Sequence, residues 1–224
     1  MFYALGTPES LSSIGQESID MAEAKLQVEI AVLDDNPFEP KEALLHHKFR
    51  ITELGPDIRS LDQVSTFPII VCDVAGVGRA FGSNLEGAHL VKEIRKTYPD
   101  KFLIAYTGQT HSVATTNALT AADKRMAKDE SIEAWIKNLE VGMDEVVNPR
   151  NRWIRMRRAL LDRRVEIFDV FKLEQAFIKA VSQRKPDVLA NKARELGVNQ
   201  EVKDLVIKFS ATAVATLIGA ALGV

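Results

Sequence analysis

Five side chains suited to phosphoryl chemistry stand at the ends of four mostly apolar stretches. Asp34 and Asp35 follow one stretch, Asp73 closes a second, Thr107 follows a third, and Lys128 follows a short fourth segment. Open α/β sheets place their chemistry at the carboxyl ends of strands. Three carboxylates offer the oxygen ligands that Mg²⁺ prefers, and a hydroxyl and an ammonium can bind phosphoryl oxygens. The spacing therefore predicts a magnesium and phosphoryl site.

Capping is the alternative for each acid taken alone. An aspartate at a strand end more often caps the next helix than attacks a substrate. Three crowded carboxylates, however, repel one another, and a divalent cation removes that penalty. The coincidence of three acids with a hydroxyl and a lysine favours the site over the caps.

Alternating strand and helix patterns account for how these residues could meet. Strands are predicted at 26–33, 50–54, 68–74, 102–106 and 125–127. Helices are predicted at 40–49, 87–98, 112–121 and 131–147, with a weak helix or loop at 57–64. This alternation predicts an α/β fold with a doubly wound, five-stranded parallel sheet, in which right-handed crossovers gather the strand ends along one edge.

The domain organisation follows from where the strand signal begins and ends. Residues 1–25 are Ser-rich and predicted to form an N-terminal arm, residues 26–148 the α/β domain, and residues 149–224 an all-α extension, with Pro149 at the boundary. In the extension we expect one long helix at 151–183, a short helix at 187–196 and a last helix from 201 onward.

Composition limits the class of protein. Of the 224 residues, 46% are hydrophobic and 27% charged, which indicates a packed core and not global disorder. A net charge of -2 and a pI near 6.1 give no overall argument for nucleic acid or an anionic membrane. The single Cys72 excludes an internal disulfide and is typical of a reducing, cytoplasmic location. The N-terminus shows no secretory signal pattern.

Taken in order, the motifs resemble the receiver domain of two-component response regulators over residues 28 to about 148, a little over half of the chain. The matching pieces are LDDNP at 33–37, VCD at 71–73, EGAHLVKEIR at 86–95, AYTG at 105–108, and AAD at 121–123 leading to Lys128. Each piece alone is weak, but all occur in order on the expected elements.

The resemblance implies a flavodoxin-like fold and a phosphorylation switch. Asp73 would accept a phosphoryl group from a histidine kinase or phosphotransfer protein, and Thr107 and Lys128 would contact the phosphoryl oxygens. Mg²⁺ would be held by Asp34, Asp35, Asp73 and the backbone carbonyl of Ala75. The chain would not be an enzyme beyond catalysing its own phosphotransfer, and no other cofactor is implied.

Three departures from the receiver pattern affect signalling more than chemistry. Asp129 follows Lys128 where receivers usually carry a proline, and Arg125 replaces the usual aromatic switch residue. The loop at 74–85 is several residues longer than in typical receivers. We hypothesise that this loop takes over signalling or kinase selection, with glycines as flexible points and Arg79 and Phe81 as contacts.

Two other motifs carry weaker signals for ligand binding. Gly76, Gly78 and Gly82 form neither a P-loop nor a dinucleotide fingerprint, because no Gly-Lys-Ser/Thr follows and Phe81 occupies the third glycine position. His46 and His47 are adjacent, so on a helix they point apart, and packing or surface exposure is favoured over metal binding.

The predicted extension carries two notable patterns. Seven arginines lie within 150–164, and the acids that follow favour a solvated or inter-subunit ion-paired face over nucleic acid. Residues 209–224 carry no charge, and Ala211, Ala215, Gly219 and Gly223 form a small-residue stripe. A buried soluble helix is favoured, and membrane insertion of residues 205–224 is the alternative.

The favoured interpretation is an atypical response regulator with output through protein contacts of the C-terminal helices, which would also form a homodimer. One alternative is a receiver-regulated membrane effector that uses residues 205–224. The other is a pseudo-receiver adaptor that keeps the fold and is not phosphorylated.

Overall fold

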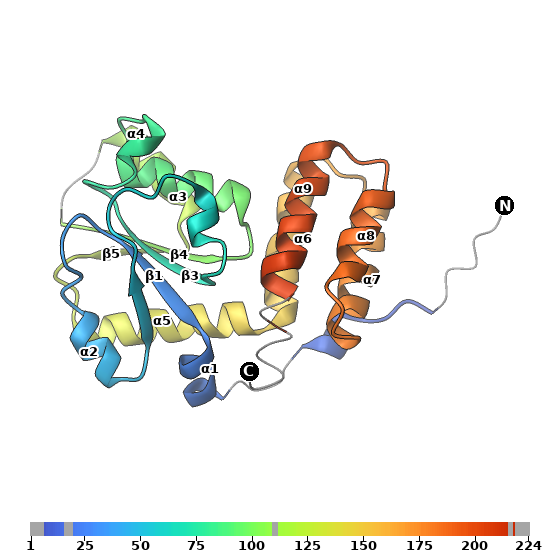
Figure 1. Ribbon diagram of the computed structural model, residues 1–224, viewed down its shortest axis with the longest axis horizontal. Helices are drawn as coiled ribbons and strands as arrows, with labels where there is room; N and C mark the ends of the chain where they lie inside the picture. Colours follow the sequence, from blue (N-terminus) through green and yellow to red (C-terminus); the bar gives the residue numbers. More distant parts are fainter. Residues whose placement is uncertain (1–6, 16–19, 109–111, 215–216, 218–224) are drawn as a thin grey trace. The chain divides into compact units, whose positions relative to one another are not determined.

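The computed structural model describes residues 7–15, 20–108, 112–214 and 217 (Figure 1). The chain divides into two compact units. The sheet unit is Ile19–Val147, and the helical unit combines Met1–Ser18 with Asn148–Val224. The predicted arm at 1–25 is therefore not one segment. Helix α1 (Met21–Gln27) packs on the sheet unit, and a 3₁₀ turn at Leu11–Ile14 packs on the helical unit.

Among the described residues, the sheet unit holds a five-stranded parallel sheet. Its strands are β1 (Glu29–Leu33), β2 (Arg50–Glu53), β3 (Ile69–Asp73), β4 (Phe102–Thr107) and β5 (Lys124–Ala127), in the order β2-β1-β3-β4-β5. This is the flavodoxin-like order, so the predicted fold class is confirmed. The three central strands are almost wholly buried, as expected of parallel strands covered on both faces.

Helices cover both faces of the sheet (Figure 1). They are α1, α2 (Lys41–His46), α3 (Glu86–Thr97), α4 (Val113–Ala118) and α5 (Ile132–Val147), with 3₁₀ turns at Leu61–Val64, Arg79–Phe81 and Leu119–Ala121. One core joins α3 to Ala31, Ile70 and Leu103, and the other joins α5 to Val32, Val71 and Ile104. The alternating residues of each strand therefore serve two separate cores.

The register brings the predicted site together at one edge of the sheet. Leu33 pairs with Cys72, Asp73 with Tyr106, and Thr107 with Ala127. Because the four strands end level with one another, the residues at and just after their carboxyl ends become neighbours.

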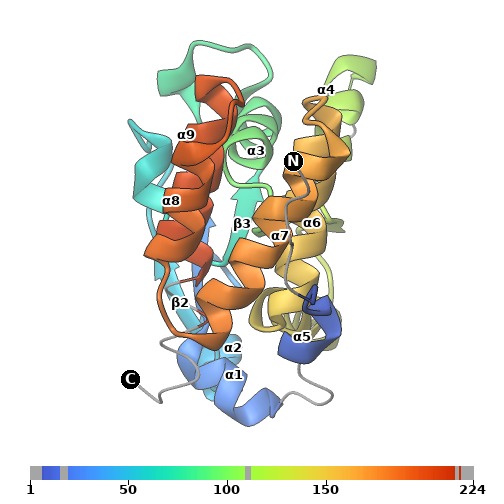
Figure 2. The same ribbon diagram turned by 90° about the vertical axis from the view of Figure 1, so that its right-hand side faces the viewer.

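The helical unit consists of α6 (Pro149–Asp162), α7 (Ile167–Ser182), α8 (Asp187–Glu195) and α9 (Gln200–Phe209), followed by a π-helical turn at Ser210–Val214. Figures 1 and 2 show these helices packed side by side. Trp153 stacks on Phe177 with ring centroids 4.9 Å apart, and Phe209 packs against both rings. This unit therefore has an aromatic core of its own.

The prediction of one long helix at 151–183 is wrong. The chain turns after α6, where Arg164 has a φ of 58°. The Val165 N–H donates to the Leu160 carbonyl and the Arg164 N–H to the Leu161 carbonyl, which is the Schellman arrangement. Leu160 and Val165 are both buried in the core of the unit. The turn therefore lets α7 fold back on α6, and Ile167 at the start of α7 is 78% exposed.

The arginines of 150–164 do not share one face. Arg152 is 1% exposed, and its Nη1 donates to the Ala213 carbonyl at 3.3 Å. Arg157 and Arg163 lie within 3.7 and 3.4 Å of glutamate oxygens. The cluster is thus divided between the core of the unit and ion pairs at its surface.

The C-terminal apolar segment packs inside the helical unit as far as it is described. Leu205, Val206, Phe209 and Val214 belong to the core of that unit, whereas Ala211 is exposed. Ala215, Gly219 and Gly223 of the predicted stripe lie outside the described residues. No helix within the described part of the chain combines the length and the apolar character needed to cross a membrane.

Candidate functional site

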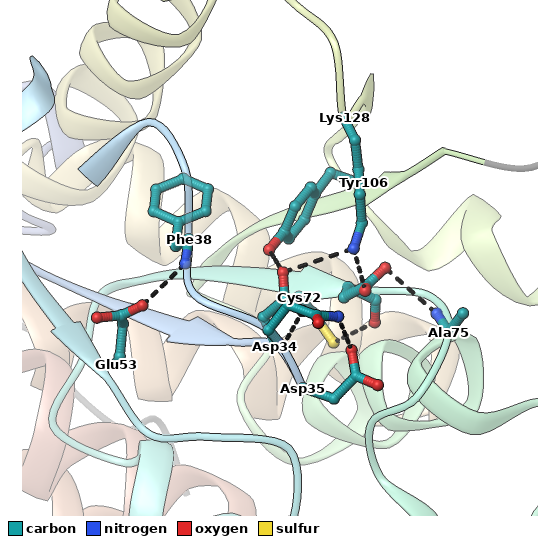
Figure 3. Close-up of polar contacts among 10 residues, drawn as sticks. Asp34, Asp35, Phe38, Glu53, Cys72, Ala75, Tyr106 and Lys128 are labelled. Atoms are coloured by element: carbon teal, nitrogen blue, oxygen red, sulfur yellow. Dashed lines mark hydrogen bonds and ion pairs between the residues drawn. The ribbon is translucent and has the colours of Figure 1, made fainter. Parts of the chain in front are cut away.

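Three carboxylates gather where β1 and β3 end (Figure 3). One oxygen each from Asp34, Asp35 and Asp73 lies within 4.8 Å of the others. Asp34 and Asp73 are buried, at 7% and 1% exposure, while Asp35 is open to solvent. A compact, all-oxygen set with one exposed member suits a hard divalent cation that keeps several waters, so these residues fit Mg²⁺.

Lys128 supplies the positive charge of the site. Its Nζ donates to Asp73 Oδ2 at 2.6 Å and lies 3.6 Å from Asp34 Oδ2. The side chain is 37% exposed and passes over the Tyr106 ring, with Nζ 5.3 Å from the ring centroid. The lysine predicted from the sequence is therefore the one that reaches the acids.

Backbone and amide donors hold the carboxylates in place. The Asn36 N–H donates to Asp34 Oδ1 at 2.8 Å, and the Asn36 side-chain amide donates to Asp35 Oδ1 at 2.7 Å. The Ala75 N–H donates to Asp73 Oδ1 at 3.3 Å. Of the three carboxylates, only that of Asp35 is exposed to solvent.

Thr107 and Ala75 complete the predicted set. Thr107 closes β4, is partly buried, and accepts the Lys128 backbone N–H on its carbonyl at 3.0 Å. Ala75 precedes Gly76, whose φ is 78°. A Cβ at Gly76 would lie 2.3 Å from Asp35 Oδ2, so the backbone after Ala75 passes directly against that carboxylate. The structure brings all six predicted site residues to one sheet edge.

The long loop after β3 is tied to the start of α3. The Gly76 N–H donates to Glu86 Oε2 at 2.6 Å, and Arg79 Nε lies 3.6 Å from Glu86 Oε1. A Cβ at Gly87 would lie 1.9 Å from the Asp73 carbonyl oxygen, so only glycine fits there. The start of α3 therefore packs directly against Asp73, and the loop is hydrogen-bonded to the start of α3.

Tyr106 is a member of the site that the sequence reasoning missed. Its hydroxyl donates to Asp34 Oδ2 (Figure 3). One sequence signal was present, because Tyr106 directly precedes Thr107 at the end of a buried strand. A buried tyrosine usually needs a hydrogen-bond partner for its hydroxyl.

The two buried acids have opposite pKa shifts. Burial raises the pKa of Asp73, and the hydrogen bond from Lys128 only partly opposes it. Burial also acts to raise the pKa of Asp34, but the hydrogen bonds from Tyr106 and Asn36 and the Lys128 charge outweigh it, so that pKa is lowered. For Lys128, burial lowers the pKa, but the hydrogen bond to Asp73 and the nearby acids raise it overall. Lys128 therefore stays charged between two acids of unequal acidity.

Burial also keeps the neighbouring groups neutral. It raises the pKa of the Tyr106 phenol, with the Asp34 hydrogen bond and charge acting in the same direction. Burial likewise raises the pKa of the Cys72 thiol, which is fully enclosed in the core.

No protein-family model and no curated protein matches the sequence. The similar solved structures include response-regulator receiver domains that align with about half of this chain. A CheY-like receiver domain protein from Methanospirillum hungatei is 16% identical over 53% of this chain and 94% of its own, with a TM-score of 0.42. A response regulator from Thermotoga maritima is 17% identical over 53% of this chain and 98% of its own, with a TM-score of 0.43.

A third similar structure extends further along the chain. It is a response regulator protein from Burkholderia pseudomallei, described with a phosphorylated aspartic acid, a calcium ion and citrate. It is 20% identical over 78% of this chain and 95% of its own, with a TM-score of 0.41.

Proposed function

We propose that the sheet unit is a response-regulator receiver domain and that the chain is a signalling protein switched by phosphorylation of Asp73. One observation carries the proposal: Asp73 ends the central strand 2.6 Å from the Lys128 ammonium, beside two further acids that converge within 4.8 Å. Each of these groups has a role in phosphoryl transfer, and the flavodoxin-like topology supports the assignment.

Asp73 acts as the nucleophile. One of its carboxylate oxygens forms a bond to phosphorus while the bond from phosphorus to the donor's imidazole nitrogen breaks, and the electron pair leaves with that nitrogen. The product is an acyl phosphate on Asp73. The start of α3 at Gly87 packs directly against the backbone carbonyl of this residue.

Asp34, Asp35, Asp73 and the Ala75 carbonyl would hold Mg²⁺. An ion held there would supply positive charge to offset the negative charge of the transferring phosphoryl group. Lys128 neutralises Asp73 before transfer, and its partly exposed side chain can then turn toward a phosphoryl oxygen. Thr107 lies at the neighbouring strand end and donates its hydroxyl to another phosphoryl oxygen.

The donor is a histidine kinase or a phosphotransfer protein, and the output is protein contact through the helical unit. Ile167 and Phe168 at the start of α7 are 78% and 55% exposed and are suited to a homodimer contact. The long loop around Arg79 selects the donor, since it is seated on the phosphoacceptor. Deleting residues 79–83 should change phosphotransfer or partner binding, and no change in either would remove this role.

The test is phosphorylation of the full chain by acetyl phosphate with Mg²⁺, read by intact mass. We expect one added phosphoryl group in the native chain and none in Asp73→Ala. Asp144→Asn, an exposed acid on α5, is the matched control and should be labelled like the native chain. No gain by the native chain, with no Mg²⁺ affinity by titration, would point instead to a pseudo-receiver adaptor.

A further inference from the structure

We infer that Tyr106 is a positioning residue for the metal site, because its hydroxyl holds Asp34 in the orientation that binds Mg²⁺. This inference rests on the proposed function, since it assigns a role toward the same cation. Asp34 Oδ2 accepts the Tyr106 hydroxyl, and Asp34 Oδ1 accepts the Asn36 N–H. Both carboxylate oxygens are thereby fixed.

The Tyr106 ring packs in a cluster of three aromatic rings with Phe38 and Trp135, which restrains the position of its hydroxyl. The residue is 3% exposed. Its ring packs edge-on against Phe38 and Trp135, with centroids 5.7 and 5.5 Å away, and those two rings pack edge-on at 5.1 Å. The Phe38 backbone is in turn anchored by its N–H bond to Glu53 at 2.9 Å. A change of Tyr106 rotamer would require the whole cluster to rearrange.

Lys128 Nζ lies 3.6 Å from the same oxygen, Asp34 Oδ2, and could replace the hydroxyl as its hydrogen-bond donor. Asp34 would then turn toward the ammonium and away from the cation position. Tyr106 prevents that turn with a neutral donor, which stabilises the carboxylate without repelling a divalent cation. Hydrogen-bond partners behind a metal ligand commonly change metal affinity by about 10- to 100-fold.

The test compares Mg²⁺ affinity in the full chain and in Tyr106→Phe by titration calorimetry. Phenylalanine keeps the ring contacts and removes only the hydroxyl. Tyr98→Phe is the matched control, because Tyr98 is 2% exposed and donates to Asp62 at 3.0 Å, outside this acid cluster. We expect Tyr106→Phe to weaken Mg²⁺ binding by about 10- to 100-fold and Tyr98→Phe to change it less than about twofold.

A second comparison tests whether the effect passes through Asp34. In an Asp34→Asn background, Tyr106→Phe should reduce Mg²⁺ affinity much less than it does in the native background. The reason is that the effects of coupled residues are not additive. Affinities too weak for calorimetry are read from Mg²⁺-induced shifts of backbone amide NMR signals, which also show that each variant is folded.

The outcomes separate this inference from the proposed function. Native-like affinity in Tyr106→Phe, or an equal loss in Tyr98→Phe, would overturn the role of Tyr106 and leave the metal site standing. The role of Tyr106 would also be overturned if Tyr106→Phe reduced Mg²⁺ affinity as much in the Asp34→Asn background as in the native background. A native chain that binds no Mg²⁺ would overturn the metal site and this inference together.

Discussion

At the scale of single residues, the surroundings of two similar aspartates shift their pKa values in opposite directions. Asp34 and Asp73 are both buried aspartates beside Lys128, yet Asp34 has the lowered pKa and Asp73 the raised one. The difference arises because Asp34 receives the Tyr106 and Asn36 donors, whereas Asp73 depends mainly on Lys128. The surroundings of Asp34 therefore stabilise its ionised form, whereas burial disfavours the ionised form of Asp73.

Replacing the two acids should change stability in opposite directions. Without Mg²⁺ at pH 7, Asp73→Asn should raise the free energy of unfolding by about 1 kcal/mol, because it removes a buried charge that the fold disfavours. Asp34→Asn should lower it by about 1 kcal/mol, because its ionised form is the one that the fold stabilises. Urea unfolding of the two variants is the measurement, and a loss of stability in Asp73→Asn would contradict it.

The stability difference between the native chain and Asp73→Asn should depend on pH. Since the folded pKa of Asp73 lies above its unfolded value, the folded state binds the proton more strongly. The free energy of unfolding of the native chain therefore falls as pH rises through the interval between those two pKa values. Above that interval it stays reduced by the same amount. Below that interval the difference should shrink. Urea unfolding of both proteins at a series of pH values is the measurement. A stability difference that grows as the pH is lowered would contradict the prediction.

Gly76 should be needed for metal binding more than for folding. A methyl group there would meet Asp35 Oδ2 at 2.3 Å on a backbone with φ of 78°. Gly76→Ala should therefore displace Asp35 and weaken Mg²⁺ binding by about tenfold or more, on the scale of disturbed ligand positions. Gly55→Ala is the matched control, because it shares a positive φ but meets nothing within 4 Å. Equal Mg²⁺ affinities in the two variants would contradict the contact.

At the scale of elements, three helices end without the glycine that usually marks such a stop. Lys48, Arg164 and Arg184 occupy the left-handed position after α2, α6 and α7. In each case the following N–H donates back to a carbonyl five residues earlier. Because no glycine marks the end of α6, the sequence pattern predicts a helix that continues to residue 183. This explains why the prediction of one helix at 151–183 is wrong.

Glycine at these stops should stabilise the protein. Arg164→Gly should raise the free energy of unfolding by about 1 kcal/mol, because a side chain in the left-handed region costs about that much. Arg158→Gly, an exposed position inside α6, should instead lower it by about 1 kcal/mol. Thermal or urea unfolding compares the two, and destabilisation by Arg164→Gly would show that its side chain matters more than its backbone.

At the scale of the whole molecule, the candidate site belongs to the sheet unit alone. All of its residues lie between Asp34 and Lys128, and the sheet unit has cores on both faces of its sheet. The helical unit is held by a different core around Trp153 and Phe177. The candidate site and the helical unit are therefore separately packed parts of the chain.

A chain limited to residues 20–147 should fold and bind Mg²⁺ as the full chain does. Circular dichroism and calorimetry measure this. In the full chain, Trp153→Ala should cost about 3–5 kcal/mol of stability, as large core truncations do, and leave Mg²⁺ affinity within about twofold. A fragment that is unfolded, or a Trp153→Ala variant that loses Mg²⁺ binding, would show that the two units depend on each other.

The sequence by itself determined the fold class and the acidic site, and the tertiary structure decided how the site is tuned. Strand periodicity and the order of motifs are local properties, so Asp34, Asp35, Asp73, Thr107 and Lys128 could be read directly from the chain. The hydroxyl contact of Tyr106 depends on the register of β3 with β4 and on the ring of Trp135, far along the chain. The turn at Arg164 after α6 likewise depends on the packing of Leu160 and Val165 in the core of the helical unit, which overrides helix propensity.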